Sequence, residues 1–490
     1  MEKNTGRQYR QIVKRTGCFG GVQGLNILAA LVRNKIAAVL LGPAGLGLMS
    51  LYNTAVKLFG DSLNLGIPMS AVKFVSESET DGQRSTVIST IRFWSLLTAI
   101  AAAVLCCALS PLVSYFYFDT SARWAEFVWL SPVCAFTILT SGELAILKGL
   151  QRLRAVATQS VVNAFLCLVV TLPFFWALGS DGVLPAVIAA AVVALGSVAW
   201  FSLKAAPYRL PLSFREAFAS GRGLVGLGVA FLLAGVMGAG VEFVIRAFIA
   251  NSGSVADVGL YNAAYVITVT YASVVFMAME TDYFPRLSAV NHDTAECNAV
   301  VNRQIEVSVL LLAPLLVAFL LALPIVVPML YSSKFLLAIG MVRLGVVAML
   351  FRAVLLPMEY MSLAKGRSWI YLLTEGCYDV AVVVAVVLGY RFLGIEGAGL
   401  GLLAAAVFNL ILDWCVCRHY YKYAIARKAA VSFAVQLVPV VATYFVATWC
   451  EGWSLWILGL LCLVWSAVYS FRRLEREAGL ADAIKAKFKR

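Results

Sequence analysis

Apolar runs of about 20 residues recur along the whole chain and constrain its fold more than any other feature. A run of this length crosses a bilayer as an α-helix, because a helix satisfies all its backbone hydrogen bonds internally. Of the 490 residues, 61% are hydrophobic and only 13% are charged. A soluble domain has about a quarter of its residues charged. The sequence therefore predicts an all-α polytopic membrane protein.

Turn residues divide the apolar runs into fourteen predicted transmembrane helices. They cover residues 14–41, 45–71, 88–115, 124–146, 155–178, 182–203, 223–250, 257–279, 304–331, 335–361, 367–390, 395–417, 429–449 and 453–471. The longer polar connections predict four parts: an N-terminal six-helix bundle (1–210), a C-terminal six-helix bundle (211–425), an additional helix pair (426–471) and a basic tail (472–490).

The basic residues are distributed unevenly between the two sides of this topology. The chain has 39 Lys and Arg against 26 Asp and Glu. With the N-terminus inside, most basic residues fall in cytoplasmic segments, and the opposite loops hold only Arg123, Lys334 and Arg391. We therefore expect both termini in the cytoplasm. The net charge of +13 then reflects topology and contact with anionic lipids, and not nucleic-acid binding.

A faint internal repeat supports two related halves. The segment 32–53 aligns with 244–265, which pairs Arg33 with Arg246 and Gly47 with Gly259. The shared Leu-Tyr-Asn strings do not fall in the same register. Internal repeats are typical of secondary transporters, in which the substrate site lies between the halves.

Ionisable residues inside the predicted spans are the main candidates for function, because a charge at membrane depth is costly. The first span carries Arg33 and Lys35. The second carries Lys57 and Asp61, whose i,i+4 spacing allows a pair along one polar stripe. Lys35 has a second interpretation, since a lysine near a helix end can extend to the interface.

The second predicted bundle carries further embedded charges. Glu242 and Arg246 have i,i+4 spacing and can form a pair. Arg343 and Arg352 lie nine residues apart, which places them on opposite faces of one helix. Asp379 follows in the next span. Asp61, Glu242 and Asp379 are candidates for ion coupling, or for pairs that only specify packing.

We hypothesise a central cavity that attracts an anionic headgroup. Its candidate substrate-binding residues are Arg33, Lys35, Lys57, Arg246, Arg343 and Arg352. Arginine offers bidentate hydrogen bonds to phosphate, and lysine acts as a point charge. The chain has no Walker A motif, no plausible catalytic set and only two histidines. We therefore expect no enzyme, no cofactor and no metal centre.

The segment LLGPAGLGLMSLYNTAVKLFGDSLNLGIPMSAVKFVSE (40–77) resembles the first helical hairpin of Wzx-type O-antigen and polysaccharide flippases. These flippases belong to the multidrug/oligosaccharidyl-lipid/polysaccharide (MOP) exporter superfamily. The turn Gly42–Gly47 is the most specific element, followed by 66–68 and 72–77. One departure is the predicted number of helices, since many such flippases have twelve.

The resemblance implies a fold of two six-helix bundles in a V, and alternating access. It implies that the substrate is an undecaprenyl-pyrophosphate-linked oligosaccharide, moved from the inner to the outer leaflet of the bacterial cytoplasmic membrane. Arg33, Lys57, Arg246 and Arg352 occupy places comparable to cationic lumen residues of the family. Membrane lipids, polysaccharide polymerase and glycosyltransferases are the implied partners of a monomeric protein.

Two alternatives within the superfamily remain open. A multidrug cation exporter would favour an acidic or aromatic cavity, whereas this sequence places more cations than carboxylates in the outer half. A lipid II flippase would match the count of fourteen helices, but residues 40–77 look more like the polysaccharide branch.

Overall fold

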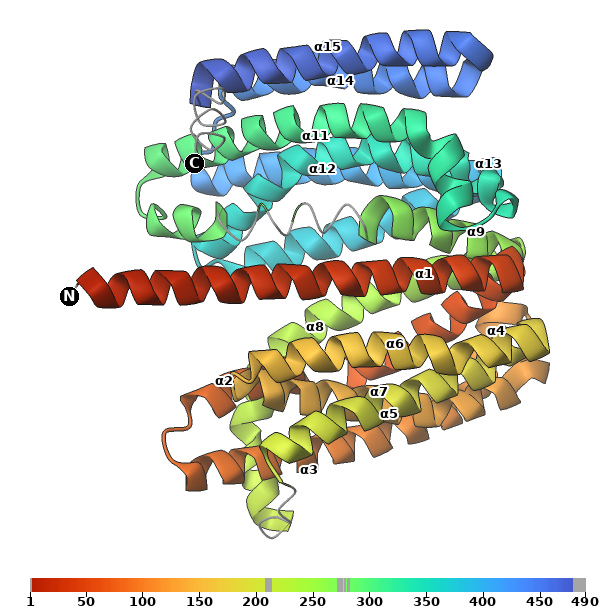
Figure 1. The fold of residues 1–490 in the computed structure, drawn as a ribbon, viewed down its shortest axis with the longest axis vertical. Coiled ribbons are helices and arrows are strands. Elements are labelled where there is room, and N and C mark those ends of the chain that lie inside the picture. The colour runs from red at the N-terminus through yellow and green to blue at the C-terminus, as the bar shows by residue number, and fades with distance from the viewer. Residues whose placement is uncertain (1, 208–213, 271–275, 277–278, 280–282, 479–490) are drawn as a thin grey trace. The chain divides into compact units, whose positions relative to one another are not determined.

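The computed structural model describes residues 2–207, 214–270, 276, 279 and 283–478. Within these ranges it describes side chains from residue 28 to 476, with further gaps between 208 and 234. Throughout this part of the chain the regular structure is helical (Figure 1). The chain forms two compact units. Unit 1 comprises Met1–Gly259 with Leu330–Ser332, and unit 2 comprises Leu260–Met329 with Ser333–Arg490. The predicted boundary at 210/211 lies among residues that the structure does not describe.

Unit 1 is built from antiparallel helices joined by short turns. Its elements are α1 (Glu2–Leu63), α2 (Ile67–Glu77), α3 (Asp81–Ala108), α4 (Ser110–Phe118), η1 (Ser121–Arg123), α5 (Trp124–Gly149), α6 (Leu153–Leu178), η2 (Gly179–Gly182), α7 (Val183–Ala205) and α8 (Phe214–Ser252). Helix α5 packs against α3 and α7, and α1 packs against α6 and α8. Helix α9 (Val255–Tyr265) begins in unit 1 and ends in unit 2.

Unit 2 holds the remaining elements. They are η3 (Val266–Thr270), α11 (Thr294–Leu330), η4 (Ser333–Ala338), α12 (Ile339–Ala364), α13 (Ser368–Tyr421), α14 (Arg427–Trp449) and α15 (Gly452–Ala478). Helix α12 packs against α13 and α14, and α14 packs against α15. Helix α15 includes the start of the predicted basic tail, whose residues 479–490 lie outside the described part.

Two of these helices each run from one predicted span into the next through one glycine. In α1 the break is Gly42, at φ 65° and ψ −169°, and in α13 it is Gly394, at φ 62° and ψ −144°. Residues with a Cβ essentially do not adopt this backbone conformation, so glycine allows each chain reversal. Pro43 follows the first break, where the fixed φ of proline suits the first turn of a helix.

The predicted spans 45–71 and 88–115 are, in contrast, interrupted: α1 ends at Leu63 before α2 begins at Ile67, and α3 ends at Ala108 before α4 begins at Ser110.

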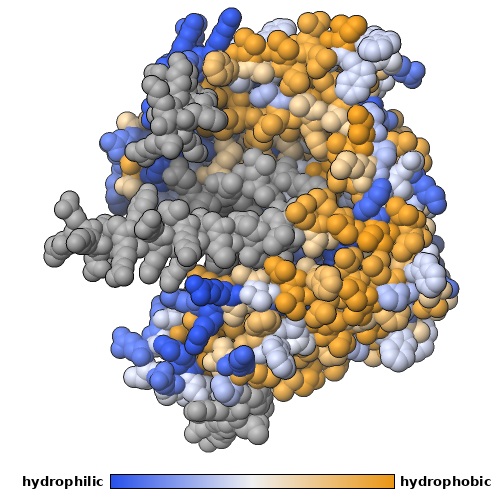
Figure 2. All heavy atoms as spheres, viewed as in Figure 1, coloured by the Kyte–Doolittle hydropathy of each residue, from blue (hydrophilic) through white to orange (hydrophobic). Residues whose placement is uncertain are grey.

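The surface composition fits a membrane environment. Nine helical segments of the described residues are long and apolar enough to span a bilayer. Hydrophobic side chains cover the middle of the visible face of unit 1, and hydrophilic ones gather at the end where α2 meets α3 (Figure 2). Large exposed side chains such as Trp176 and Trp200 are stable in contact with lipid, since no hydration cost applies there. The chain is therefore a polytopic membrane protein.

The closest backbone approach in unit 1 joins α1 to the start of α9. A Cβ added to Gly47 would lie 1.8 Å from the carbonyl oxygen of Val255, and one added to Gly259 would lie 1.9 Å from that of Pro43. Only glycine therefore allows this crossing. The repeat alignment pairs these same two glycines, and the fold brings them into direct contact.

Polar contacts join α14 to α15 and join both helices to α11. The Gln436 side-chain amide donates to the Ser466 carbonyl at 3.0 Å and to Ser470 Oγ at 2.7 Å. Glu306 of α11 accepts a hydrogen bond from Ser432 and forms an ion pair with Arg473, each at 3.2 Å. The helix pair is thus attached by buried polar contacts as well as by apolar packing.

Candidate functional site

The packing of α1 against α8 brings together four of the residues singled out from the sequence. The second half of α1 presents Ser50, Thr54, Lys57 and Asp61 at intervals of three or four residues, so they share one face. Helix α8 presents Glu242 and Arg246 one turn apart. The two helices are in contact over this stretch, and both belong to unit 1.

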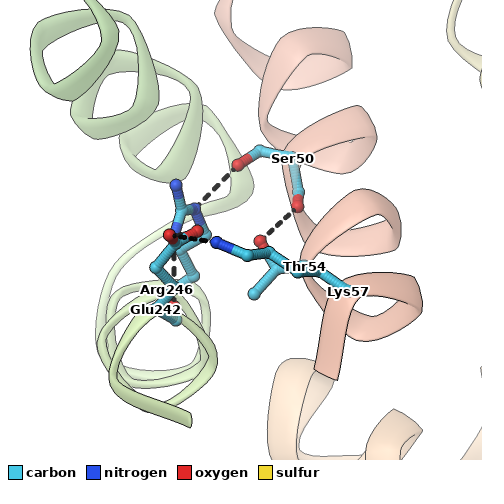
Figure 3. Close-up of polar contacts among 5 residues, drawn as sticks. All are labelled: Ser50, Thr54, Lys57, Glu242 and Arg246. Carbon is cyan, nitrogen blue, oxygen red and sulfur yellow. Dashed lines mark hydrogen bonds and ion pairs between the residues drawn. The ribbon is translucent and has the colours of Figure 1, made fainter. Parts of the chain in front are cut away.

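The Glu242 carboxylate lies between two cations. Its Oε1 is 2.7 Å from Lys57 Nζ, and its Oε2 is 3.1 Å from Arg246 Nη1 (Figure 3). The spacing of Glu242 and Arg246 thus does produce an ion pair within α8. Lys57, in contrast, extends across to α8 and does not run along its own helix toward Asp61. Each oxygen of the carboxylate therefore interacts with a different cation.

The two cations differ in their environment. The Arg246 side chain is only 5% exposed, and its Nε donates to Ser50 Oγ at 2.9 Å. The Ser50 carbonyl in turn accepts from Thr54 Oγ1 at 2.8 Å. The Lys57 side chain is 46% exposed. Arg246 therefore anchors Glu242 in position, and Lys57 keeps donors available for a ligand.

Asp61 lies one turn beyond Lys57 on the same face of α1. It is half-buried and close enough to interact electrostatically with Lys57 and Glu242. Gly235 of α8 lies opposite, and a Cβ built on it would be 3.8 Å from Asp61 Cβ. The four ionisable groups, Lys57, Asp61, Glu242 and Arg246, balance in formal charge.

Arg33 and Lys35 add positive charge to the same unit. Arg33 is exposed, and it lies within electrostatic range of Cys167 on α6. Lys35 is half-buried. Together with the residues of the α1–α8 contact, unit 1 holds four embedded cations against two carboxylates among the candidates. Arg33, beside Cys167 of α6, has different neighbours from Lys57 and Arg246, which contact Glu242 of α8.

The remaining candidates belong to unit 2 and have separate surroundings. Arg343 on α12 has Glu396 and Tyr444 as electrostatic neighbours. Arg352, on the same helix, has Tyr378 and Glu359 among its neighbours. The two arginines therefore face different groups, as their spacing on one helix requires.

Asp379 is the third unit 2 candidate. It lies half-buried on α13, and its electrostatic neighbour is Glu375. Glu375 is also among the neighbours of Arg352. Glu375 thus lies within electrostatic range of both Asp379 and Arg352.

One buried ion pair was missed at the level of sequence. Arg92 on α3 donates from Nε and Nη2 to the two oxygens of Glu143 on α5, at 2.8 and 3.0 Å. Ser202 of α7 also donates to Glu143, and the carbonyl of Ala206 accepts from Arg92 at 3.0 Å. Arg92 lies near the start of the predicted span 88–115 and Glu143 near the end of the next span, 124–146, so the predicted topology indicates a similar depth for both but no contact. This bidentate pair ties three helices together.

Comparison with known families identifies the N-terminal part of the chain. Residues 12–291 match the family described as "Polysaccharide biosynthesis protein". This match covers more than half of the chain and includes every residue of the α1–α8 contact. None of the curated proteins matches the chain in sequence.

Several solved membrane transporters have a similar fold. An inward-facing multidrug resistance MATE transporter of the MOP superfamily aligns with a TM-score of 0.67 at 16% identity, over 81% of this chain and 94% of that one. The lipid II flippase MurJ, in an inward closed conformation, aligns with a TM-score of 0.68 at 12% identity, over 94% and 99%. An outward-facing MATE transporter aligns at 0.57 and 16% identity, over 82% and 93%.

Proposed function

Because the chain belongs to the polysaccharide biosynthesis protein family and has the fold of MOP-superfamily transporters, we propose that it is a flippase for a lipid-linked oligosaccharide. The substrate is a polyprenyl-pyrophosphate carrying a surface-polysaccharide repeat unit, such as an O-antigen unit. It moves from the inner to the outer leaflet of a bacterial cytoplasmic membrane by alternating access. Glycosyltransferases act before this transport step, and a polymerase acts after it.

The charge balance of unit 1 is the observation that supports this substrate class. Among the candidates of unit 1, four cations (Arg33, Lys35, Lys57 and Arg246) outnumber two carboxylates (Asp61 and Glu242), and Lys57 and Arg246 contact Glu242 directly. A pyrophosphate diester carries about two negative charges, which matches the excess. The half-exposed Lys57 and the exposed Arg33 have donors available for its oxygens.

The cation excess also argues against export of cationic drugs. A cation approaching the α1–α8 contact would be repelled by the half-exposed Lys57. The MATE neighbours share the fold at 16% identity, and that likeness concerns architecture alone.

A second candidate substrate is lipid II, which is also a polyprenyl-pyrophosphate glycolipid. The observation that favours it is the count of fourteen predicted helices, which lipid II flippases share. The alignment with MurJ, at 12% identity, concerns architecture alone. Both candidates require recognition of the same pyrophosphate. They differ in the sugar.

A leaflet-translocation assay distinguishes these substrates. Purified protein is reconstituted in liposomes with a labelled polyprenyl-pyrophosphate oligosaccharide, with lipid II, or with a fluorescent lipophilic cation. We expect the oligosaccharide lipid to reach the opposite leaflet faster than in protein-free vesicles. Movement of lipid II alone would favour the second candidate. Extrusion of the cation without glycolipid movement would contradict the proposal.

A further inference from the structure

A cavity of 410 Å³ opens at one end of unit 2, apart from the residues discussed above. It is lined by Asn291, His292, Thr294, Lys365, Arg367, Tyr420, Tyr421 and Lys422. These residues come from three places: the start of α11, the turn between α12 and α13, and the end of α13. The predicted topology puts all three on the cytoplasmic side. The cavity is thus formed jointly by three connections between helices.

The lining of this cavity is basic. Lys365, Arg367 and Lys422 contribute three cations, and none of the described lining residues is a carboxylate. Lys365 Nζ donates to the Asn291 carbonyl at 2.7 Å, which fixes it against the wall. The guanidinium of Arg367 lies 5.8 Å from the ring centre of Tyr421. A cavity with three cations, two of them held by neighbouring groups, is suited to an anion.

The nearest carboxylate in sequence, Asp293, is engaged elsewhere. Its Oδ1 accepts hydrogen bonds from the backbone N–H groups of Ala295 and Glu296, at 2.7 and 3.1 Å. Asp293 thus caps α11 by accepting hydrogen bonds from backbone N–H groups in the first turn of the helix. Asp293 therefore already has hydrogen-bond partners in its own helix. Arg367, the residue before α13, makes no side-chain cap to that helix.

Aromatic side chains place the cavity at the level of a membrane interface. Tyr420 is 51% exposed and Trp369, in the first turn of α13, is 68% exposed. The guanidinium of Arg418 lies 5.3 Å from the ring centre of Trp414. Exposed Trp and Tyr beside basic residues are typical of the headgroup region, where amphipathic rings are stable. Leu373, which is also exposed, lies one helical turn after Trp369, where the apolar part of α13 begins.

We propose that this cavity binds the phosphate group of an anionic phospholipid. The three cations contact the phosphate, and the acyl chains lie along the apolar surface of α13 beyond Trp369. Basic pockets between transmembrane helices are known to hold such headgroups. The bound lipid would join α11, α12 and α13 at one end. The site is independent of the transported substrate.

Lipid binding to the intact protein tests this proposal. The protein is held in zwitterionic phosphatidylcholine nanodiscs, and binding of phosphatidylglycerol is titrated by native mass spectrometry. We expect the double variant Arg367→Gln/Lys422→Gln to bind phosphatidylglycerol about thirtyfold more weakly, since each cation near an anionic lipid contributes about a fivefold gain in affinity. This variant leaves the hydrogen bond of Lys365 in place.

Two further variants make the test decisive. Thr294→Glu adds a negative charge to the cavity in the first turn of α11, where an acidic residue suits the helix, and should also weaken binding. Lys148→Gln removes an exposed cation of unit 1 and should leave binding unchanged. Unchanged binding in the double variant would overturn the proposal. Displacement of the lipid by inorganic pyrophosphate at equal concentration would overturn the choice of a lipid.

Discussion

At the scale of single residues, Glu242 forms ion pairs with two cations whose side chains differ in solvent exposure. Arg246 is buried against Ser50, while Lys57 is half-exposed. A buried guanidinium that loses its carboxylate retains an uncompensated charge, whereas a half-exposed lysine can be solvated. The two contacts of one carboxylate should therefore differ in their effect on stability.

We expect Glu242→Gln to lower the free energy of unfolding by about 2 kcal/mol, because Arg246 keeps its charge and loses its partner. Lys57→Met should change it by less than about 1 kcal/mol, because an exposed ion pair contributes little. Thermal unfolding in detergent micelles measures both. Equal effects would show that Arg246 does not depend on this carboxylate.

Arg92→Lys is the second residue-scale prediction. Lysine keeps the charge but cannot make the bidentate contact with Glu143, so we expect a loss of about 2 kcal/mol in unfolding free energy. Arg84→Lys on the same helix is the matched control. Arg84 lies 3.5 Å from a fully exposed Asp81 and donates one hydrogen bond to the Ser78 carbonyl at 3.1 Å, so its replacement should have a smaller effect, below about 1 kcal/mol. A similar melting temperature for the two variants would contradict the structural role of Arg92.

Part of this site was predictable from the sequence, and part was not. The i,i+4 spacing of Glu242 and Arg246 identifies their pair, since helix geometry alone sets that distance. The contact of Lys57 with Glu242 depends on the register of α1 against α8, which no local pattern records. The same limit applies to Arg92 and Glu143, which lie on different helices.

At the scale of elements, the crossing of α1 and α9 depends on two glycines. The Val255 carbonyl oxygen occupies the position that a side chain on Gly47 would need. The approach is between backbones, so no side-chain movement can relieve a clash.

We expect Gly47→Ala to reduce the yield of folded protein and to lower the unfolding temperature, because the added Cβ would lie 1.8 Å from a carbonyl oxygen. Gly238→Ala in α8 is the control. A Cβ there meets nothing within 4 Å, and alanine favours a helix. Size-exclusion chromatography and thermal unfolding measure the outcome. A Gly47→Ala protein as stable as the control would contradict the close crossing.

The helical architecture was largely predictable, because apolar length and turn residues determine transmembrane helices. Gly42 and Gly394 mark two chain reversals where the predicted spans 14–41 and 367–390 end. The attachment of α14 and α15 was not predictable. Gln436 and Ser466 each lie in an apolar run, and their hydrogen bonds can be recognised only when the pairing of α14 with α15 is known.

At the scale of the whole molecule, the proposed function requires that unit 1 attracts an anion. Arg246 is a poor residue for testing this, because its burial makes any replacement a change in packing. Lys57 is better placed. Its replacement removes one positive charge and leaves the Glu242–Arg246 pair intact.

The most direct measurement is therefore the initial rate of glycolipid translocation by Lys57→Gln and Lys57→Arg in liposomes, with equal protein insertion. We predict that Lys57→Gln lowers the rate at limiting substrate by about tenfold or more, since a charge-assisted hydrogen bond to phosphate contributes about 1.5–3 kcal/mol. Lys57→Arg should retain most of the rate. Equal rates for wild type and Lys57→Gln would contradict recognition of the pyrophosphate by this cation.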